Sequence, residues 1–392
     1  MKVIILAAWE WSRLRPLTNT IPKPLIKIFG KSILEHNLES LYKYVEEIII
    51  VVKYKQELIK KAFWNNYKWI KIVYKEQSNE KGTWAAIRWI KANTDIIIMN
   101  WDSIFEKNDL EKVLKYNWYW VLVKKVPDPE KYWVFNVNED WYIKQIVEKP
   151  TEYIWNLASL WVYKFNKNIF ELAENIKLST RWEYEITDAI NEFVKTSKFK
   201  PFEIEWEFID VRYPFDILTS NAHFLNKLLK SEIKWNIEEW VTIKWNIILE
   251  EWAILKSWTY IEWNVYIWNN SIIWPNTYLR WCTVIWDNCK IWNAVEVKNS
   301  SIWDSTHIAH LSYIWDSVIW NNVNIGWWFI TANLRHDKGN IKIPIKWELI
   351  DSWLHKFWVI IWDNSKIWIK CYSMPGRVIE NDSLINPGTM VK

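Results

Sequence analysis

Residues 261–285 read IEWNVYIWNNSIIWPNTYLRWCTVI, and an aliphatic side chain occupies every sixth position of this stretch. Neither an α-helix nor a flat strand has a period of six. A chain that coils through three short strands per turn does, because each six-residue unit turns one aliphatic side chain inward. The sequence therefore predicts a solenoid. The full aliphatic series is Ile243, Leu249, Leu255, Ile261, Ile267, Ile273, Leu279, Ile285, Ile291 and Val297.

The repeat continues beyond this series with two irregularities. Its phase slips by one residue at Ile302 and again at Ile319. Residues 326–356 break the repeat, so we expect an insertion or loop there, and residues 359–391 are expected to form the last coils. We assign residues 231–392 to one repeat domain.

Residues 1–230 have a different pattern and are predicted to form a separate domain, because apolar runs alternate with helical spacing. This alternation predicts a largely parallel sheet with helices on both faces. Ligands then bind at the carboxyl ends of the strands. The expected strands include residues 3–8, 47–53, 70–74 and 96–99, and the expected helices include residues 32–44, 56–63, 83–92 and 215–229.

The charges of the chain nearly balance, with 50 basic and 46 acidic residues and a formal net charge of +4. This balance predicts no nucleic-acid-binding surface and no membrane-binding patch. No apolar stretch approaches the length of a membrane span. The cysteines, Cys282, Cys289 and Cys371, fit no metal-binding spacing and are interpreted as reduced thiols of a cytoplasmic protein.

The chain contains 36 tryptophans and only 6 glycines, whereas glycine is normally about 7% of a protein. Many tryptophans follow an isoleucine in a turn-like context, as Trp268 and Trp286 do, and the same series continues with Gly326. Solenoid corners need small residues, because positive φ is common there. We interpret most tryptophans as standing where the natural protein has glycine, the simplest cause being a source that reads UGA as glycine. The alternative is a protein that is genuinely rich in tryptophan.

Residues 6–18 read LAAWEWSRLRPLT and are followed by Pro-Lys-Pro at 22–24. A loop that wraps a triphosphate must bring backbone N–H groups close to it, which glycine permits, and needs fixed cations such as Arg13 and Lys23. With Trp9 and Trp11 read as glycine, the stretch resembles the signature of the sugar-phosphate nucleotidylyltransferases. Real tryptophans there would obstruct the loop. The resemblance implies that Arg13 and Lys23 are catalytic and that Leu6, Ala8, Trp9 and Trp11 bind the nucleotide.

Further short motifs match the same family in order along the chain. Gln77 with Lys81-Gly82-Thr83 resembles the segment that reads the nucleotide base. Asn100-Trp101-Asp102 follows a predicted strand and resembles N-G-D, which implies that Asp102 is a magnesium ligand. Asp210, in a stretch resembling D-V-G-Y-P, is the second implied ligand, although Arg212 replaces the usual glycine. The resemblance also implies residues that hold the sugar phosphate, namely Trp133, Glu148, Lys149 and Asn156, with a further strip from Glu183 to Asp188.

The repeat domain resembles the hexapeptide-repeat acyltransferases, chiefly through His310-Leu311-Ser312-Tyr313. The resemblance implies that His310 is a general base, and an imidazole of near-neutral pKa suits an amine that must lose a proton. We expect the repeat to return Asn324, fourteen residues on, to the same face as His310. The other implied residues are Arg280, Lys298, Tyr313 and Asn324 for the sugar phosphate, and Asn333 and Lys338 for acetyl-CoA, with Lys342 as an alternative to Lys338.

Together these resemblances cover nearly the whole chain and imply a bifunctional sugar-1-phosphate nucleotidylyltransferase/acetyltransferase of the archaeal type. The implied fold is an α/β Rossmann-like domain followed by a left-handed parallel β-helix. Such an enzyme acetylates glucosamine-1-phosphate from acetyl-CoA and then joins the product to UTP with Mg²⁺, releasing pyrophosphate. A homotrimer through the β-helix is implied as well. The sequence leaves the choice between UTP and dTTP and the identity of the sugar open.

Two other functions remain open at this point. One is a single-activity glucose-1-phosphate thymidylyl- or uridylyltransferase with a purely structural β-helix. The other is a regulatory subunit that binds a sugar nucleotide without turnover. The presence of Arg13, Lys23, Asp102 and Asp210 argues against the second.

Overall fold

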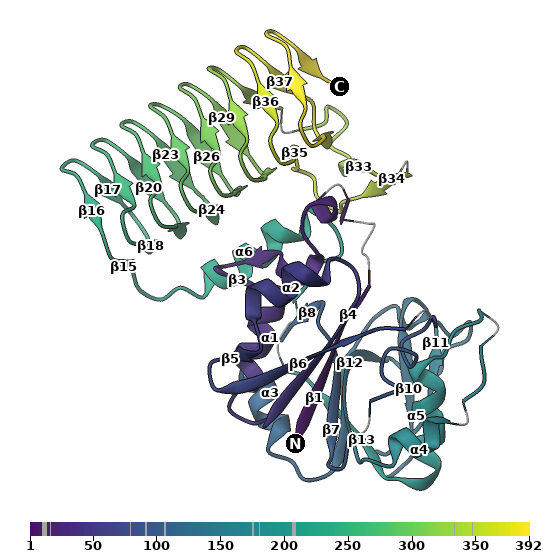
Figure 1. The fold of residues 1–392 in the computed structure, drawn as a ribbon. Helices are drawn as coiled ribbons and strands as arrows, with labels where there is room; N and C mark the ends of the chain where they lie inside the picture. Colours follow the sequence, from purple (N-terminus) through teal and green to yellow (C-terminus); the bar gives the residue numbers. More distant parts are fainter. Residues whose placement is uncertain are drawn as a thin grey trace. The chain divides into compact units, whose positions relative to one another are not determined.

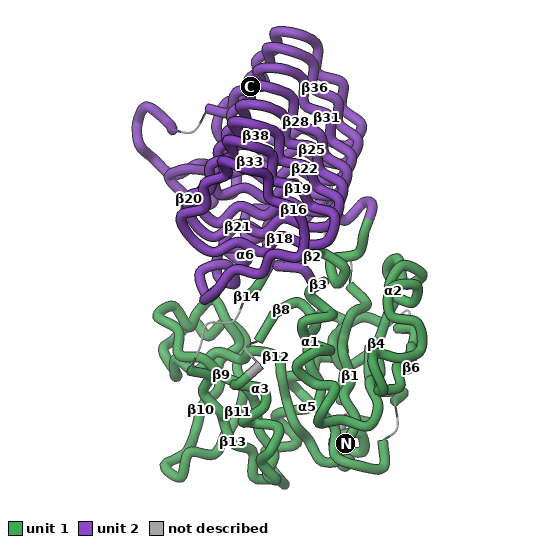
Figure 2. Tube along the Cα trace, turned by 90° about the vertical axis from the view of Figure 1, so that its left-hand side faces the viewer, with its two compact units in different colours: residues 1–10, 21–27, 31–210 green, residues 11–20, 28–30, 211–392 purple. Residues whose placement is uncertain are grey.

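The computed structural model describes residues 1–9, 14–15, 17–78, 80–90, 92–105, 107–174, 176–179, 181–205, 209–332, 334–346 and 348–392. The chain forms two compact units. Unit 1 comprises Met1–Glu10, Ile21–Lys27 and Lys31–Asp210, and unit 2 comprises Trp11–Thr20, Ile28–Gly30 and Val211–Lys392 (Figure 2). Two short segments from the N-terminal part of the chain therefore belong to the unit that contains the repeats.

Unit 1 is built on a ten-stranded mixed sheet in the order β11-β10-β12-β7-β1-β4-β6-β5, with β9 paired to β12 and β13 paired to β9. Strand β1 (Lys2–Ala7) pairs in parallel with β4 (Glu47–Val52) on one side and with β7 (Ile96–Asn100) on the other. Strand β6 (Ile70–Glu76) continues the parallel part beside β4. Strands β1, β4 and β7 are nearly continuous apolar runs because helices and loops cover both faces of a parallel sheet, whereas β6 also carries exposed charged residues. The four predicted strands are thus confirmed.

The remaining elements of unit 1 surround or extend this parallel part (Figure 1). Helices α4 and α5 lie beside the antiparallel strands β10 and β11. The strands are β2 (Lys27–Ile28), β3 (Lys31–Ser32), β5 (Asn66–Tyr67), β8 (Ser103–Ile104), β9 (Tyr119–Lys125), β10 (Trp133–Val137), β11 (Ile143–Glu148), β12 (Leu157–Phe165), β13 (Phe199–Glu203) and β14 (Ile209–Asp210). The helices are α1 (Ile33–Leu41), α2 (Gln56–Phe63), α3 (Lys107–Leu114), α4 (Ile169–Glu174) and α5 (Ile186–Thr196).

Two of the predicted helices of unit 1 are present and one is not. Helices α1 and α2 match the expected residues, and α1 begins where the Ser32 hydroxyl accepts a hydrogen bond from the backbone N–H of Glu35. The helix expected over residues 83–92 is wrong, because residues 83–89 form a series of turns. The backbone N–H of Trp84 donates to Tyr184 outside the segment, and those of Ile87 and Arg88 both donate to the Trp84 carbonyl. A regular i to i−4 ladder therefore does not form.

Unit 2 is a parallel β-helix whose coils stack along one direction, as the repeat predicts (Figure 1). Helix α6 (Asp216–Asn226) precedes it. Each coil contributes one short strand to each of three eight-stranded parallel sheets. The backbone N–H of Asn246 donates to the side-chain oxygen of Asn264 in the next coil, a separation of 18 residues. The backbone N–H of Asp287 donates to the side chain of Asp304 in the same way, but over only 17 residues. The predicted phase slips are therefore coils that are one residue shorter.

The strands of the three sheets are two or three residues long. The first sheet holds β15 (Glu232–Ile233), β18 (Ile247–Leu249), β21 (Val265–Ile267), β24 (Thr283–Ile285), β27 (Ser301–Ile302), β30 (Val318–Ile319), β35 (Val359–Ile361) and β38 (Arg377–Ile379). The second holds β16 (Asn236–Ile237), β19 (Ile254–Leu255), β22 (Ile272–Ile273), β25 (Lys290–Ile291), β28 (His307–Ile308), β31 (Asn324–Ile325), β36 (Lys366–Ile367) and β39 (Leu384–Ile385). The third holds β17 (Thr242–Ile243), β20 (Tyr260–Glu262), β23 (Tyr278–Arg280), β26 (Glu296–Lys298), β29 (Tyr313–Trp315), β32 (Ile330–Thr331), β37 (Tyr372–Ser373) and β40 (Met390–Val391).

The core of the β-helix is the predicted aliphatic series. Every member from Leu249 to Val297 is buried, and Ile243 packs against the cluster from the first coil. The expected start of the insertion at residue 326 is wrong, because the coil continues to Thr331. Phe329 and Thr331 are buried there at positions that aliphatic residues take in other coils. The six-residue aliphatic pattern therefore does not reveal this part of the coil. The insertion itself contains an antiparallel hairpin of β33 (Lys342–Ile345) and β34 (Glu348–Asp351).

The corners of the β-helix require residues that tolerate positive φ. One corner position is occupied in successive coils by Trp252 (φ 62°), Asn270 (φ 58°) and Asn288 (φ 59°). Asparagine visits this region far more readily than a bulky residue does, and glycine does so at no steric cost. Tryptophan thus occupies the backbone conformation that asparagine takes in the next coils, which supports the interpretation that glycine belongs at such positions.

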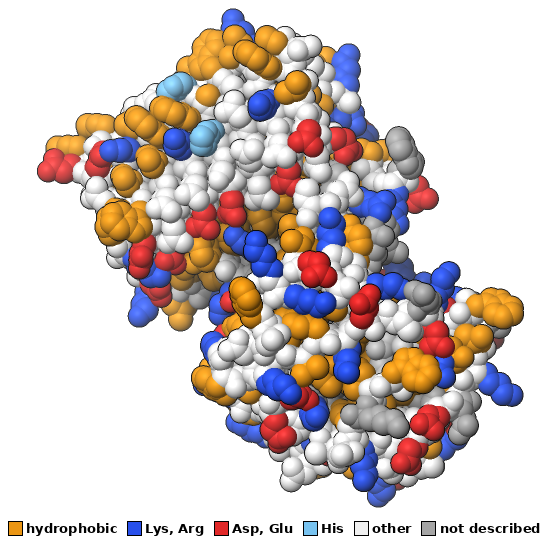
Figure 3. Space-filling model, viewed as in Figure 1, with side chains coloured by type: hydrophobic (Ala, Val, Ile, Leu, Met, Phe, Trp, Pro, Cys, Tyr) orange, Lys and Arg blue, Asp and Glu red, His pale blue; other side chains and the backbone are white. Residues whose placement is uncertain are grey.

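The surface seen in Figure 3 intersperses acidic and basic side chains within each unit. No helix among the described residues combines the length and the apolar character needed to cross a membrane.

Candidate active site

A buried lysine and a carboxylate meet at the carboxyl end of β7 in unit 1. Lys23 lies in a short 3-10 helix (Lys23–Leu25), and its Nζ is 3.9 Å from Oδ2 of Asp102. The lysine side chain is completely buried, and 15% of the Asp102 side chain is exposed. The Asn37 amide donates to the Trp101 carbonyl over 3.0 Å, which fixes the turn that carries Asp102. The structure therefore brings two of the predicted catalytic and metal-binding residues together.

The second predicted metal ligand lies beside this pair. Strands β8 and β14 are antiparallel, and their register places Asp210 opposite Ser103, the neighbour of Asp102. Mg²⁺ binds proteins through one or two carboxylates and takes its other oxygens from water and substrate phosphates. The two aspartates suit this ion. No group of three or more histidine, cysteine or acidic side chains that could hold a metal occurs in the described part of the chain.

The segment predicted to recognise the base is tied to the start of helix α5. Gly82 has φ +111°, and a Cβ there would overlap with the backbone of Tyr184. The backbone N–H of Tyr184 donates to the Lys81 carbonyl, and the Thr83 hydroxyl accepts the N–H of Ile186 over 2.9 Å. Thr83 therefore caps α5, and the predicted nucleotide segment positions the predicted sugar strip.

The other predicted nucleotide residues lie at the end of β1 and β6. Leu6 and Ala8 are buried at the carboxyl end of β1, followed by the partly buried Trp9. Gln77 is buried directly after β6, and its backbone N–H donates to Val52. Arg13 and Trp11 lie outside the described residues.

Four of the predicted sugar-phosphate residues of unit 1 lie on, or directly beside, the strands β10, β11 and β12. Trp133 on β10 and Glu148 on β11 are register partners, and the Nζ of Lys149 lies 5.7 Å from the centre of the Trp133 ring. The carbonyl of Asn156, just before β12, accepts the backbone N–H of Val126.

Arg181 was missed by the sequence analysis although it lies in the same pocket. It bonds both carboxylate oxygens of Glu148, at 2.8 and 2.5 Å, and Glu185 at 2.9 Å. Burial raises the pKa of Glu185, and Arg181 opposes this shift. Its position in the sequence could have identified Arg181, because it lies two residues before the predicted strip that begins at Glu183. These residues line a cavity of about 600 Å³ with Gln145, Ile146, Val147, Ser179, Thr187, Asp188 and Asn191.

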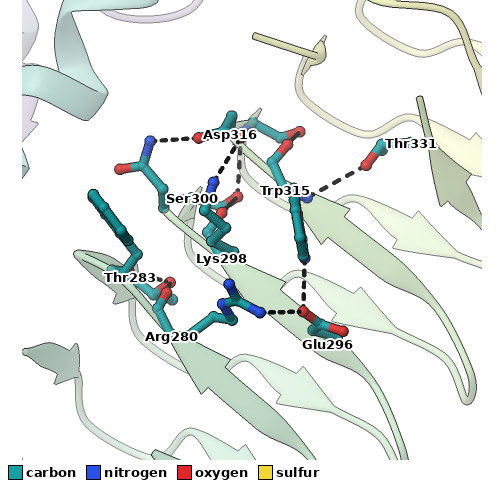
Figure 4. A network of polar contacts seen from close by, with 11 residues as sticks. Arg280, Thr283, Glu296, Lys298, Ser300, Trp315, Asp316 and Thr331 are labelled. Carbon is teal, nitrogen blue, oxygen red and sulfur yellow. Dashed lines mark hydrogen bonds and ion pairs between the residues drawn. The ribbon is translucent and has the colours of Figure 1, made fainter. Parts of the chain in front are cut away.

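In unit 2 the predicted phosphate-binding cations lie on one sheet of the β-helix. Arg280 on β23 and Lys298 on β26 are register partners on the third sheet (Figure 4). The same sheet carries Tyr313 on β29. Arg280 pairs with Glu296 over 3.4 Å. Tyr313 is the register partner of Glu296 in the next coil. The structure thus brings these residues together.

Lys298 is held by a second carboxylate that the sequence analysis did not identify. Its Nζ lies 3.2 Å from Oδ2 of Asp316, and the two side chains are only 11% and 5% exposed. The Asn299 amide donates to the other oxygen of Asp316 over 2.6 Å. Burial raises the pKa of the Asp316 carboxyl, whereas Asn299 and Lys298 act in the opposite direction.

His310 lies at the corner between β28 and β29, where its ring is 5.3 Å from that of Trp292. The expectation that Asn324 returns to the face of His310 is wrong. Asn324 is the register partner of His307 on the second sheet. The position that stacks on His310 in the next coil lies close to Trp328, whose backbone N–H donates to the His310 carbonyl. The reason is that one coil takes 17 residues here, so fourteen residues do not complete it.

The predicted acetyl-CoA residues lie near the start of the insertion. Lys338 is exposed in a turn, and its N–H donates to the Arg335 carbonyl. Asn333 lies outside the described residues. A cavity of about 640 Å³ occurs next to Tyr313 and includes His336, which the sequence analysis did not single out. Its other lining residues are Thr331, Ala332, Leu334, Arg335, Asp337, Met374 and Pro375.

Solved structures share the fold at low sequence identity. A glucose-1-phosphate thymidylyltransferase structure from Bacillus anthracis is 24% identical with a TM-score of 0.51 and covers 59% of this chain and 97% of its own. A UDP-glucose pyrophosphorylase from Acinetobacter baumanii is 18% identical with a TM-score of 0.52, covering 58% of this chain and 94% of its own. These likenesses concern the fold alone.

Curated relatives match over the full length. "Bifunctional protein GlmU" of Methanocaldococcus jannaschii is 40% identical over 100% of this chain and 95% of its own length. "Bifunctional sugar-1-phosphate nucleotidylyltransferase/acetyltransferase" of Sulfurisphaera tokodaii is 36% identical over 100% of this chain and 97% of its own. Residues 2–227 match the family model described as nucleotidyl transferase. The chain therefore belongs to the family of bifunctional sugar-1-phosphate nucleotidylyltransferase/acetyltransferases.

Proposed function

We propose that this protein acetylates glucosamine-1-phosphate from acetyl-CoA and transfers a uridylyl group from UTP to the product, giving UDP-N-acetylglucosamine and pyrophosphate. The observation that carries the proposal is the buried Lys23 within 3.9 Å of Asp102, at the carboxyl end of a central parallel strand. The full-length relatives bear names of the same two activities.

In unit 1, an oxygen of the sugar phosphate attacks the α-phosphorus of UTP and pyrophosphate leaves. Lys23 and Arg13 stabilise the negative charge of the phosphates, and Lys23 is well placed to do so because burial keeps its charge from being screened by water. Asp102 and Asp210 would hold Mg²⁺, which neutralises phosphate charge when bound. Glu148 and Lys149 orient the sugar phosphate in the neighbouring pocket.

In unit 2, the amine of glucosamine-1-phosphate attacks the thioester carbon of acetyl-CoA, an amide bond forms and the thiol leaves. His310 accepts the proton that the amine loses. Arg280 and Lys298 bind the phosphate of the sugar. Glu296 and Asp316 hold these two cations in place before the phosphate arrives.

We also propose that three chains associate through the β-helix. The third sheet carries an outward column of side chains, in register from coil to coil, that are aromatic or aliphatic from the coil of Tyr260 to that of Tyr372 except at Glu296. Apolar side chains exposed in a row on one face are typical of protein–protein interfaces. The exposed members are Tyr260, Ile330 and Tyr372. Sedimentation equilibrium tests this, and a monomer at micromolar concentration would contradict it.

One experiment separates the proposed function from the two alternatives. Pyrophosphate release is measured over a grid of UTP and dTTP against sugar-1-phosphates, and acetyl-CoA consumption is measured with glucosamine-1-phosphate. Both activities are expected. Pyrophosphate release without acetyl transfer would favour the single-activity enzyme, and binding of sugar nucleotide without either reaction would favour the regulatory subunit.

A further inference from the structure

The segment that precedes Lys23 is fixed to the β-helix by a hydrogen bond between residues far apart in sequence. The Thr20 hydroxyl lies 2.8 Å from Oδ2 of Asp363, a separation of 343 positions. Both residues belong to unit 2. Thr20 directly follows a short 3-10 helix (Leu17–Asn19), and both its N–H and its hydroxyl lie within hydrogen-bond distance of the Leu17 carbonyl, at 3.2 and 3.0 Å. Asp363 follows β35 in the β-helix.

Asp363 is held rigidly enough to serve as an anchor. Asp363 is buried, with only 5% of the residue exposed. Its Oδ1 accepts hydrogen bonds from the backbone N–H of Asn321, at 3.2 Å, and from the Asn321 amide, at 2.9 Å. The neighbouring coil therefore fixes one carboxylate oxygen and leaves the other directed at Thr20.

A second anchor holds the chain on the other side of Lys23. The backbone N–H of Phe29 donates to Oδ1 of Asn221 on α6 over 2.9 Å. The Phe29 ring stacks on Phe224 with centroids 5.3 Å apart and meets Tyr266 edge-on at 5.1 Å. Thr20 and Phe29 thus bracket the segment that carries Lys23, and both are attached to unit 2.

We infer that Asp363 is a positioning residue for nucleotidyl transfer, acting through Thr20 on the segment that carries Lys23. The inference rests on the proposed function, because it assigns UTP to that segment. Lys23 must meet the phosphates in one geometry, and a chain fixed at both ends loses less conformational entropy when the nucleotide binds. On this inference, loss of the anchor in the β-helix raises the KM for UTP in nucleotidyl transfer.

The test uses the full chain and compares Thr20→Val, Thr20→Ser and Asp363→Asn. Initial rates with UTP and N-acetylglucosamine-1-phosphate give KM and kcat, and acetyl transfer by the same preparations reports on the β-helix. We expect Thr20→Val to raise the KM for UTP about 10-fold, since a hydrogen bond to a charged group is lost. Its kcat stays within about threefold, and Thr20→Ser stays within about twofold of the parent in both constants.

The matched control is Asp382→Asn. Asp382 also accepts a hydrogen bond from an asparagine amide at a corner, that of Asn364 over 3.0 Å, but this bond joins two neighbouring coils of the β-helix. This variant is expected to leave the KM for UTP unchanged. If Asp382→Asn raised this KM as much as Asp363→Asn, the effect would be a general one of the β-helix and the inference would be overturned.

A double variant and hydrogen exchange make the result independent of any one substitution. If Thr20 and Asp363 act as a pair, the double variant that combines Thr20→Val and Asp363→Asn should have the KM for UTP of the worse single variant. A KM increase equal to the product of the two single increases would contradict the inference. Amide exchange at residues 17–20 should become faster in Asp363→Asn. Unchanged UTP kinetics in Thr20→Val would overturn the inference alone, while a parent protein that releases no pyrophosphate would overturn the proposed function.

Discussion

The backbone of Tyr184 lies directly against the α-carbon of Gly82, leaving no space for a side chain between them. This contact joins the segment predicted to read the nucleotide base to the start of helix α5. Because Gly82 also has φ +111°, two independent constraints require glycine there.

Gly82→Ala is expected to impair nucleotidyl transfer and to lower the stability of unit 1 by about 1–3 kcal/mol, the usual cost of a strained backbone position. Thermal unfolding and the KM for UTP measure the two effects. Gly388→Ala is the matched control, because Gly388 has φ +71° with no atom within 4 Å of an added Cβ. Equal effects of the two substitutions would show that the contact with Tyr184 is unimportant.

Asp102→Asn is expected to abolish nucleotidyl transfer and to leave acetyl transfer largely intact. The substitution removes an anionic metal ligand and the partner 3.9 Å from Lys23, so several kcal/mol of barrier should return. Separate assays of pyrophosphate release and acetyl-CoA consumption check this. UDP-sugar formation near the parent rate would exclude Asp102 from the metal site.

His310→Ala is expected to slow acetylation of glucosamine-1-phosphate by roughly 10²–10⁴-fold, the usual contribution of a positioned general base. The same protein should still convert UTP and N-acetylglucosamine-1-phosphate. His355→Ala is the control, because His355 is an exposed histidine of the same unit. Acetylation at the parent rate in His310→Ala would favour the single-activity alternative or another base.

Asp316→Asn is expected to change the pH dependence of β-helix stability. Burial raises the pKa of Asp316 in the folded state, so the folded protein binds this proton more tightly than the unfolded chain does. Its contribution to the free energy of unfolding therefore grows as the pH falls, and is complete below the unfolded pKa near about 3.9. Between pH 7 and pH 4 the parent should gain thermal stability relative to the variant. A difference that does not vary with pH would contradict the assignment.

The intact mass of the protein from its native source is expected to fall well below 47.9 kDa, because glycine replaces most tryptophans. Buried indole N–H groups support this expectation, since an unmade hydrogen bond costs about 1–3 kcal/mol for each. A measured mass of 47.9 kDa would end this interpretation. The buried indole nitrogens without a partner include those of Trp84, Trp120, Trp268, Trp274, Trp303, Trp320, Trp358 and Trp362.

The β-helix was predictable from sequence because its hydrophobic period is strict and local. Each inward aliphatic residue marks the position of one strand in the sequence, and even the shortened coils at Ile302 and Ile319 can be recognised as phase slips. The start of the insertion was not predictable in this way, because Phe329 and Thr331 fill core positions without matching the aliphatic pattern.

The site was predictable where single motifs carry it and not where distant segments meet. Asp102 and Asp210 could be identified from short motifs, and their proximity follows from a strand pairing. The pairing of Lys298 with Asp316 depends on coil length, and the bond between Thr20 and Asp363 depends on tertiary structure. No local pattern in the sequence reports either contact.

The insertion of the β-helix leaves after β32 and returns at β35, which pairs with β30 as the next coil would, with Val318 opposite Ile360. The strands on either side therefore find their register without help from the connecting chain. A protein cut within the hairpin loop between Ile345 and Glu348 would present two complementary ends, each with open strand edges. Such fragments, expressed separately, should reassemble by strand addition, which makes this loop a natural place to split the enzyme.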